Sequence, residues 1–199
     1  MRRRDRRDRG ATIVEFIVVL PLLLLLAIGT VEMSTGWVAH DRAQTAGAQA
    51  ARVAAVSGAR VEADRDLLVS LQAALPAELL ANLDRVVVFK PSSLQGAIPL
   101  GCIKAVGSTS DVGATGSCNS YSGATVRAVS PTSMAGFGGG TSAIDRYWAP
   151  ASRKDTLAGP PDYVGVWVRT VHESTTGGFF GDITLAKTTV FRIQPDLDG

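Results

Sequence analysis

One acidic residue stands in an otherwise apolar run near the N-terminus. The run extends from Ala11 to Gly29, and Glu15 is its only charged residue. As a helix it would be about 28 Å long, close to the roughly 30 Å of a bilayer's hydrocarbon core. A carboxylate near the centre of a bilayer costs about 2.5–3.5 kcal/mol on insertion scales. We therefore expect Glu15 either close to a membrane surface or beside a partner of opposite charge.

Two cysteines, Cys102 and Cys118, are the other residues with an obvious chemistry. Outside the cytosol, an even pair of cysteines is typical of a disulfide. Closing a loop of this length is worth about 3 kcal/mol in the chain-entropy model. Two free thiols are one alternative. A metal site is a weaker alternative, because no histidine or carboxylate cluster lies near the cysteines in the sequence. We expect the disulfide.

The remaining reactive residues form no recognisable catalytic motif. His40 and His172 have no neighbour at metal-ligand spacing, and each is expected at the surface or as a hydrogen-bonded core group. The glycine run 136–140 lacks the lysine and the strand–helix frame of a phosphate-binding loop, so we expect a flexible link. Asp145 and Arg146 are expected to form a local surface pair. We expect no enzyme activity, no metal and no cofactor, although sequence cannot reveal a nucleophile–base pair assembled by the fold.

Charge is distributed unevenly along the 199 residues, whose formal net charge is +2. Residues 1–10 hold six arginines and two aspartates, whereas residues 11–199 hold 14 Lys and Arg against 16 Asp and Glu. A nucleic-acid-binding protein needs a basic face on its folded part, so no nucleic-acid partner is expected. Positive residues beside a membrane helix stay in the cytoplasm. We therefore expect the N-terminus inside and the residues after the helix outside.

Three kinds of segment combine a basic leader with an apolar run: an uncleaved anchor, a secretory signal and a processed leader. A secretory signal has an apolar region of about 7–15 residues, shorter than this one, and a glutamate within it is unfavourable. The stretch GATIVEF, from Gly10 to Phe16, instead resembles the cleavage signal of type IV prepilins. The resemblance implies that a prepilin peptidase cuts after Gly10. Ala11 then becomes the first residue, with Glu15 fifth and Phe16 sixth.

Processing would give Glu15 a partner. Cleavage frees a positive amine on Ala11, about 6 Å along the helix from Glu15. In a bundle of such helices, Glu15 of one subunit can face the Ala11 amine of a neighbour, and this pairing offsets the cost of a charge in lipid. The alternative is that Glu15 reaches the inner headgroups without a protein partner. We expect the pair, which makes Ala11 and Glu15 a subunit contact.

The first helix is expected to continue well beyond the membrane, to a stop at Gly58. Its membrane-spanning part covers about residues 11–30, and Pro21 should kink or loosen it. Trp37 falls near the outer headgroups, where tryptophan anchors are common. A stripe of small residues recurs every three or four positions and is expected to pack on the exported domain rather than form a groove for a partner; it comprises Ala39, Ala43, Ala46, Ala50 and Val53.

The rest of the pattern predicts a small antiparallel sheet. A second helix is expected over 62–75, ended by Pro76. Strands rich in β-branched and aromatic residues are expected over 84–90, 163–173 and 183–195, the last two as a hairpin. The stretch 91–141 is expected to be a surface loop stapled by the disulfide, with a short strand at 124–129. A long helix laid on such a sheet is an α+β arrangement.

The N-terminal segment RGATIVEFIVVLPLLLLLAIGTVEM resembles the TadE-like family, pilin-like proteins of the tight-adherence (Tad/Flp) pilus system. The exported part is similar in RVVVFKP, in the cysteine loop ending CNSY, in VGVWVRTVHE and in TTVFRIQP. The resemblance implies a pilin-like fold and a minor pilin or pseudopilin. Its partners would be other Tad/Flp pilins and pseudopilins, a prepilin peptidase and an inner-membrane assembly platform. An uncleaved single-pass cell-surface binding or adhesion module is the alternative.

These features divide the chain into three parts. Residues 1–10 form a basic cytoplasmic leader, residues 11–58 the N-terminal helix, and residues 59–199 an exported α+β domain with the disulfide loop. We expect a single-pass protein of the cell membrane, with a cytoplasmic N-terminus and an extracytoplasmic C-terminal domain. Incorporation into a pilus stays open.

Overall fold

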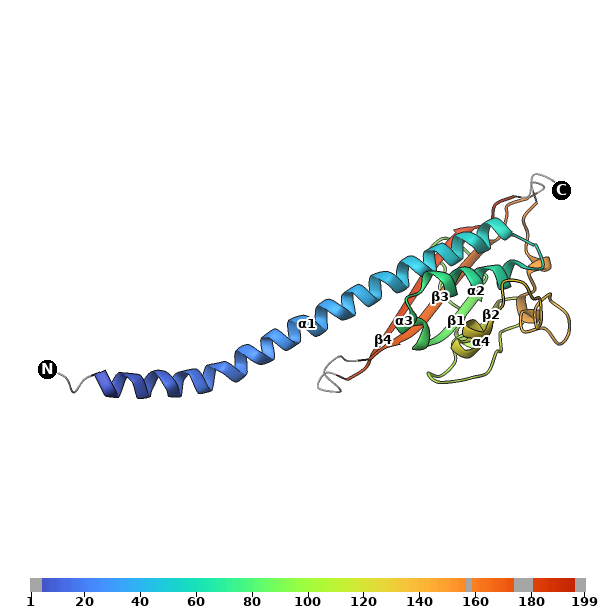
Figure 1. The fold of residues 1–199 in the computed structure, drawn as a ribbon. Coiled ribbons are helices and arrows are strands. Elements are labelled where there is room, and N and C mark those ends of the chain that lie inside the picture. Colours follow the sequence, from blue (N-terminus) through green and yellow to red (C-terminus); the bar gives the residue numbers. More distant parts are fainter. Residues whose placement is uncertain (1–4, 157–158, 174–180, 196–199) are drawn as a thin grey trace.

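One long helix carries a folded domain on its C-terminal half (Figure 1). The computed structural model describes residues 5–156, 159–173 and 181–195, with side chains from Ile13 onward. Helix α1 (Asp5–Ser57) protrudes from the domain toward the N-terminus. The domain contains a four-stranded antiparallel sheet. The expected α+β architecture is therefore confirmed.

Helix α1 has two halves with different surroundings. Side chains from Ile13 to Ile28 are exposed, whereas the stripe of alanines between Ala39 and Ala54 is buried against the domain. The helix continues through Pro21, and its course bends in the N-terminal half (Figure 1). It ends as expected at Gly58, whose positive φ of 55° is accessible to glycine and whose N–H donates to the carbonyl of Ala54.

The sheet has the strand order β2-β1-β3-β4. Its strands are β1 (Leu83–Phe89), β2 (Cys118–Ser122), β3 (Tyr163–His172) and β4 (Ile183–Arg192). The three expected strands are confirmed, and β3 and β4 pair along all ten residues from Tyr163–Arg192 to His172–Ile183. Strand β2 was not expected, because CNSYS is polar and lies in a stretch rich in glycine and serine.

The short strand expected at 124–129 is wrong. This stretch forms helix α4 (Gly123–Ala128). The Ser122 side chain accepts a hydrogen bond from the N–H of Thr125, which is the usual way a serine caps a helix N-terminus. The β-branched Thr125 and Val126 suggested a strand, but a local cap and packing of Val126 into the core favour the helix.

One face of the sheet packs on helices. The core between them combines the α1 alanines with leucines of α2 (Ala63–Ala74) and α3 (Ala77–Ala81) and with valines of β1 and β3. The leucines Leu67, Leu68, Leu71 and Leu75 are buried, as the spacing predicts. Small residues bring α1 close to the strands: a Cβ added at Gly47 would lie 3.4 Å from Cγ2 of Val168.

The other face is covered by the cysteine-containing stretch. A second apolar cluster joins Val87, Phe89 and Trp167 of the sheet to the disulfide Cys102–Cys118. Strand β1 is thus covered on both faces, which explains its continuous apolar run. The stretch expected as a surface loop is therefore a layer of the fold. Besides β2 and α4 it contains the 3₁₀ turn η1 (Leu100–Cys102). Two further 3₁₀ turns follow it, η2 (Arg146–Trp148) and η3 (Pro150–Ser152).

Candidate functional site

The exposed half of α1 is the most unusual surface of the molecule. Its large apolar side chains are open to their surroundings, with Phe16 60 % and Leu26 60 % exposed. In a water-soluble domain such a surface would be buried. Among the described residues, one helix segment, Ile13–Ser57, is long and apolar enough to cross a membrane, with a mean hydropathy of 2.6 in its most apolar stretch. The apolar half therefore has the length and composition of a membrane span.

Glu15 lies on this exposed surface, beside Phe16 in the following position. Within the part of the chain that the structure describes, Glu15 makes no hydrogen bond or ion pair. The backbone of Gly10 and Ala11 continues α1, but the surroundings of their side chains lie outside the described residues. The expected contact between Ala11 and Glu15 of neighbouring subunits therefore stays a prediction.

The prepilin-like stretch, the exposed span and the start of the packed helix are contiguous in one element. Residues 10–52 match the family model described as TadE-like protein. The expected resemblance is confirmed over this segment, which includes Gly10, Ala11, Glu15 and Phe16. No curated protein and no solved structure matches the chain.

The TadE-like match covers the apolar half of α1 and most of its packed half. TadE-like proteins are a pilus-associated structural family and not an enzyme family. The match therefore points to a Tad pilus-associated protein, and together with the apolar helix it points to a membrane location.

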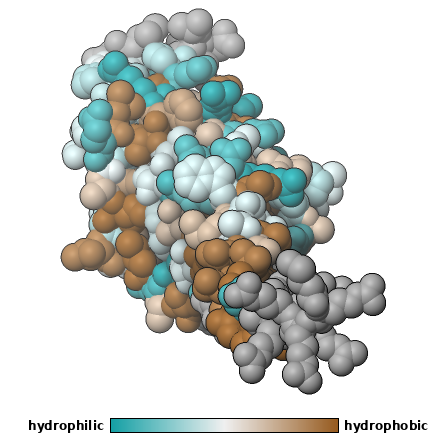
Figure 2. All heavy atoms as spheres, turned by 90° about the vertical axis from the view of Figure 1, so that its left-hand side faces the viewer, coloured by the Kyte–Doolittle hydropathy of each residue, from teal (hydrophilic) through white to brown (hydrophobic). Residues whose placement is uncertain are grey.

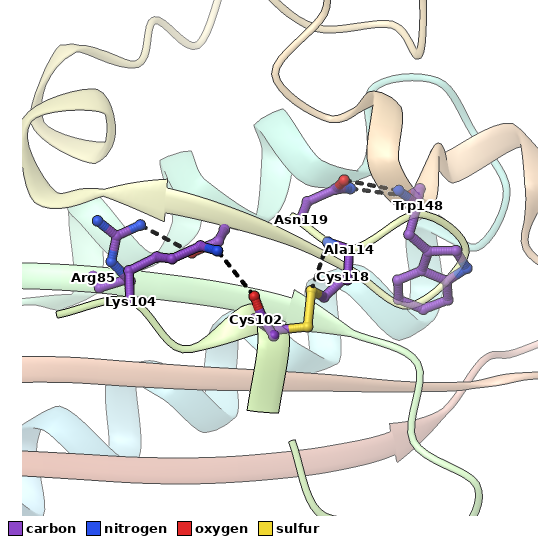
Figure 3. The surroundings of a disulfide bond; sticks show 9 residues. Arg85, Cys102, Lys104, Ala114, Cys118, Asn119 and Trp148 are labelled. Carbon is purple, nitrogen blue, oxygen red and sulfur yellow. Dashed lines mark hydrogen bonds between the residues drawn. A yellow bond between two sulfur atoms is a disulfide. The ribbon is translucent and has the colours of Figure 1, made fainter. Parts of the chain in front are cut away.

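The cysteine-containing layer is fixed to the sheet outside the TadE-like segment. The structure joins Cys102 to Cys118, linking η1 to the start of β2 (Figure 3). Nearby, Arg85 donates to the carbonyls of Ser108 and Ser110, and Arg169 donates to the carbonyl of Lys104. The disulfide and the two arginines thus attach the stretch from Cys102 to Cys118 to the sheet.

These two arginines are directly opposite each other on β1 and β3. Like charges in such a cross-strand pair repel. Asp84 compensates, since its carboxylate accepts from Nε of Arg169 at 2.6 Å. Its other oxygen accepts from the N–H of Gly107. Neither arginine was predicted from the sequence to have a role; a charged residue within an apolar strand was the available signal.

We expect alkylation in denaturant to modify neither Cys102 nor Cys118 before reduction and both of them after it, because their sulfurs are bonded. Denaturant is needed because both residues are fully buried in the native protein. Mass spectrometry after alkylation in denaturant, with and without reductant, separates the bond from simple burial. Labelling of both thiols in unreduced, denatured protein would contradict the disulfide.

A buried polar cluster links α2 to β2 and to the turns that follow it. The Asp64 carboxylate accepts hydrogen bonds from Nδ2 of Asn119 at 2.8 Å, from Oη of Tyr121 at 2.5 Å and from Arg153. Asn119 also pairs with the backbone of Trp148, as Figure 3 shows. Burial, together with the nearby Asp64 charge, raises the pKa of Tyr121 well above its ordinary 10.0. The cluster has a structural role: it holds α2, β2 and the following turns together, and its charged groups are buried.

The expected surface pair of Asp145 and Arg146 is wrong. Asp145 is fully buried and accepts from the backbone N–H groups of Gly138 and Gly139 at 2.9 and 2.8 Å. Arg146 instead donates to the carbonyl of Ala143 and to the Tyr147 hydroxyl. The glycine run is therefore anchored rather than a flexible link. Its N–H groups do bind an anion, but the anion is a carboxylate of the same chain.

The two histidines have different environments. His40 lies half-buried beside the ring of Trp37 on α1. His172 is 5 % exposed, and neither ring nitrogen has a hydrogen-bond partner among the described residues. The expectation of a surface or hydrogen-bonded histidine is therefore wrong for His172. In the described part of the chain no three His, Cys, Asp or Glu residues are grouped to hold a metal ion.

Proposed function

We propose that this chain is a membrane-anchored minor pilin or pseudopilin that acts in the assembly of a Tad/Flp-type pilus or secretion machine. The observation that carries the proposal is the division of a single helix, α1. Its first half presents apolar side chains outward, and its second half is part of the domain core. Such a subunit can be held in a bilayer and can also pack its exposed half against the same segment of other subunits.

The TadE-like match supports the Tad-specific part of the proposal, because it includes the exposed half of α1. The bulky domain also argues against a plain major pilin of this system, which is much shorter. We propose the parts as a leader over 1–10, the helix over 11–58 and an exported domain over 59–199. The arginine-rich leader favours a cytoplasmic N-terminus.

The proposed partners are other Tad/Flp pilins and pseudopilins, the prepilin peptidase and an inner-membrane assembly platform. The proposed contact between subunits is the Glu15 carboxylate with the free amine of Ala11. An uncleaved surface-binding module would share the same fold and anchor, but it would keep the leader. Processing at Gly10 therefore distinguishes the two functions.

We expect the mature chain to begin at Ala11 and Gly10→Val to prevent this processing, because a β-branched side chain obstructs access of a peptidase to the backbone. Gly10→Ala should retain part of the cleavage. Gly29→Val, which changes another glycine of α1, is the matched control and should be cleaved normally. Mass spectrometry of membrane-extracted protein gives the N-terminus. Finding residues 1–9 intact on the mature wild-type protein would exclude the processed-pilin proposal.

A further inference from the structure

The C-terminal end of β3 and the N-terminal end of β4 lie at the end of the sheet that faces the apolar half of α1 (Figure 1). The last paired residues there are His172 and Ile183. Both lie against α1 at Gly36, where an added Cβ would be 3.8 Å from Cδ1 of Ile183 and 3.9 Å from Cδ2 of His172. The folded domain therefore contacts α1 from about Gly36 onward, and this end of the hairpin is the edge of the domain nearest the apolar half of the helix.

The length of the span places that edge at the membrane surface. A hydrocarbon core of roughly 30 Å takes about 20 helical residues. Counted from Ala11, where the apolar run begins, these reach Thr30. Gly36 lies six residues, about 9 Å, further along. The headgroup layer on each side of a bilayer is roughly 5–7 Å thick, so Gly36 and the hairpin end lie at its outer edge.

The side chains at this level suit the headgroup region. Met33 and Trp37 are 75 % and 72 % exposed and lie four residues apart, on one face of α1. Ile183, on the hairpin, is 42 % exposed. Figure 2 views the molecule from the side on which α1 protrudes, so the apolar half of the helix faces the viewer, and apolar side chains gather in the lower part of this view. Tryptophan and neighbouring apolar groups are favoured where a membrane meets water.

We propose that the hairpin end carrying Ile183, together with Met33 and Trp37, rests against the outer headgroups of the leaflet from which the domain emerges. The partner of this surface is a lipid bilayer. With α1 as one attachment and the hairpin end as a second, the domain is held at one angle to the membrane instead of turning freely about a single helix. The inference rests on the proposed anchoring by α1, but not on pilin assembly.

The charges at this edge define the kind of lipid. Glu173 and Asp182, which directly flank the paired residues of the hairpin, are both exposed. Carboxylates repel anionic headgroups, so the contact does not depend on anionic lipid. It should form on vesicles of phosphatidylcholine alone, and added phosphatidylglycerol should weaken it.

A depth measurement on the reconstituted full chain tests the contact. A single cysteine replaces Thr184 or, as the matched control, Thr141; both threonines are exposed, and Thr141 belongs to the loops at the opposite end of the domain (Figure 1). The native cysteines are joined and do not take the fluorescent label. In vesicles of phosphatidylcholine containing a headgroup-attached nitroxide lipid, we expect strong quenching of the label at 184 and little at 141.

Substitutions at two residues of closely similar exposure distinguish a contact of the hairpin end with lipid from mere proximity to the membrane. Ile183 is 42 % exposed and Val61, which follows α1 at its far end, is 43 % exposed. We expect Ile183→Asp to lose most of the quenching at 184 and Val61→Asp to keep it. Equal quenching at 184 and 141, quenching that survives Ile183→Asp, or quenching that rises with protein-to-lipid ratio would overturn the inference; the last would mean that a second copy covers the surface.

Flotation of the same vesicles distinguishes this inference from the function on which it rests. Protein that floats with lipid but shows no quenching at 184 refutes the hairpin contact and leaves the anchored pilin-like proposal standing. Protein that does not float refutes the anchor itself and both proposals with it.

Discussion

Asp64→Ala is expected to lower the free energy of unfolding by about 3–5 kcal/mol, because it leaves the Arg153 guanidinium buried without its counter-ion. Both side chains of this ion pair are fully buried. Nε and Nη1 of Arg153 already lack hydrogen-bond partners among the described residues, so besides Asp64 the charge has the face of the Trp148 ring, 4.4 Å away, as its neighbour. Since domains have about 5–15 kcal/mol of total stability, such a loss would remove a large part of it.

The matched control lies on the same helix. Asp66 pairs with Arg65, but these side chains are 33 % and 16 % exposed. A pair this close to solvent contributes about 0–1 kcal/mol, so Asp66→Ala should be nearly silent. Urea unfolding of the detergent-solubilised full chain, followed by the fluorescence of its tryptophans, measures both variants. Two unfolding free energies within 1 kcal/mol of each other would contradict the structural role of Asp64.

A double variant shows whether the charge of Arg153 causes the loss. Arg153→Met removes the guanidinium, keeps a long apolar side chain and leaves the neighbouring Trp148 ring covered. Adding Arg153→Met to Asp64→Ala should recover part of the lost stability, because no unpaired charge is then buried. If the double variant is less stable than Asp64→Ala by the full cost of Arg153→Met alone, the two residues do not act as a pair.

Glu15→Leu is expected to be processed and to stay in the membrane, yet to fail to join other pilin subunits. If Glu15 pairs with the amine of a neighbour's Ala11, the variant leaves that amine in lipid without its partner. Breaking a buried pair costs about 3–5 kcal/mol, part of which is lost to solvation near the membrane edge. Even about 2 kcal/mol per contact would shift a subunit equilibrium roughly thirtyfold.

Co-purification with the other pilins is the measurement, and two further variants make it specific. Glu15→Gln keeps the size and removes the charge, so it should fail in the same way. Val14→Leu changes the preceding residue, which is also exposed, and should assemble normally. Equal recovery of partners with Glu15→Leu and with wild type would show that the carboxylate is no assembly contact and reaches the headgroups instead.

Features encoded by neighbouring residues were predictable from the sequence. The apolar run, the alanine stripe and Gly58 define α1, because helical surroundings repeat every three to four residues. Runs rich in β-branched and aromatic residues likewise define β1, β3 and β4. The TadE-like resemblance also rests on contiguous residues, and it held for 10–52.

Features made by distant residues were decided by the tertiary structure alone. Asp64 and Arg153 are 89 positions apart, and nothing near either residue distinguishes it from an ordinary surface charge. The polar strand β2 exists because β1 pairs with it, and the glycine run is ordered because Asp145 folds back onto it. Local sequence sets the conformations available to a segment. Which residue or strand pairs with a buried charge or an unpaired strand is decided only when distant segments come together in the folded chain.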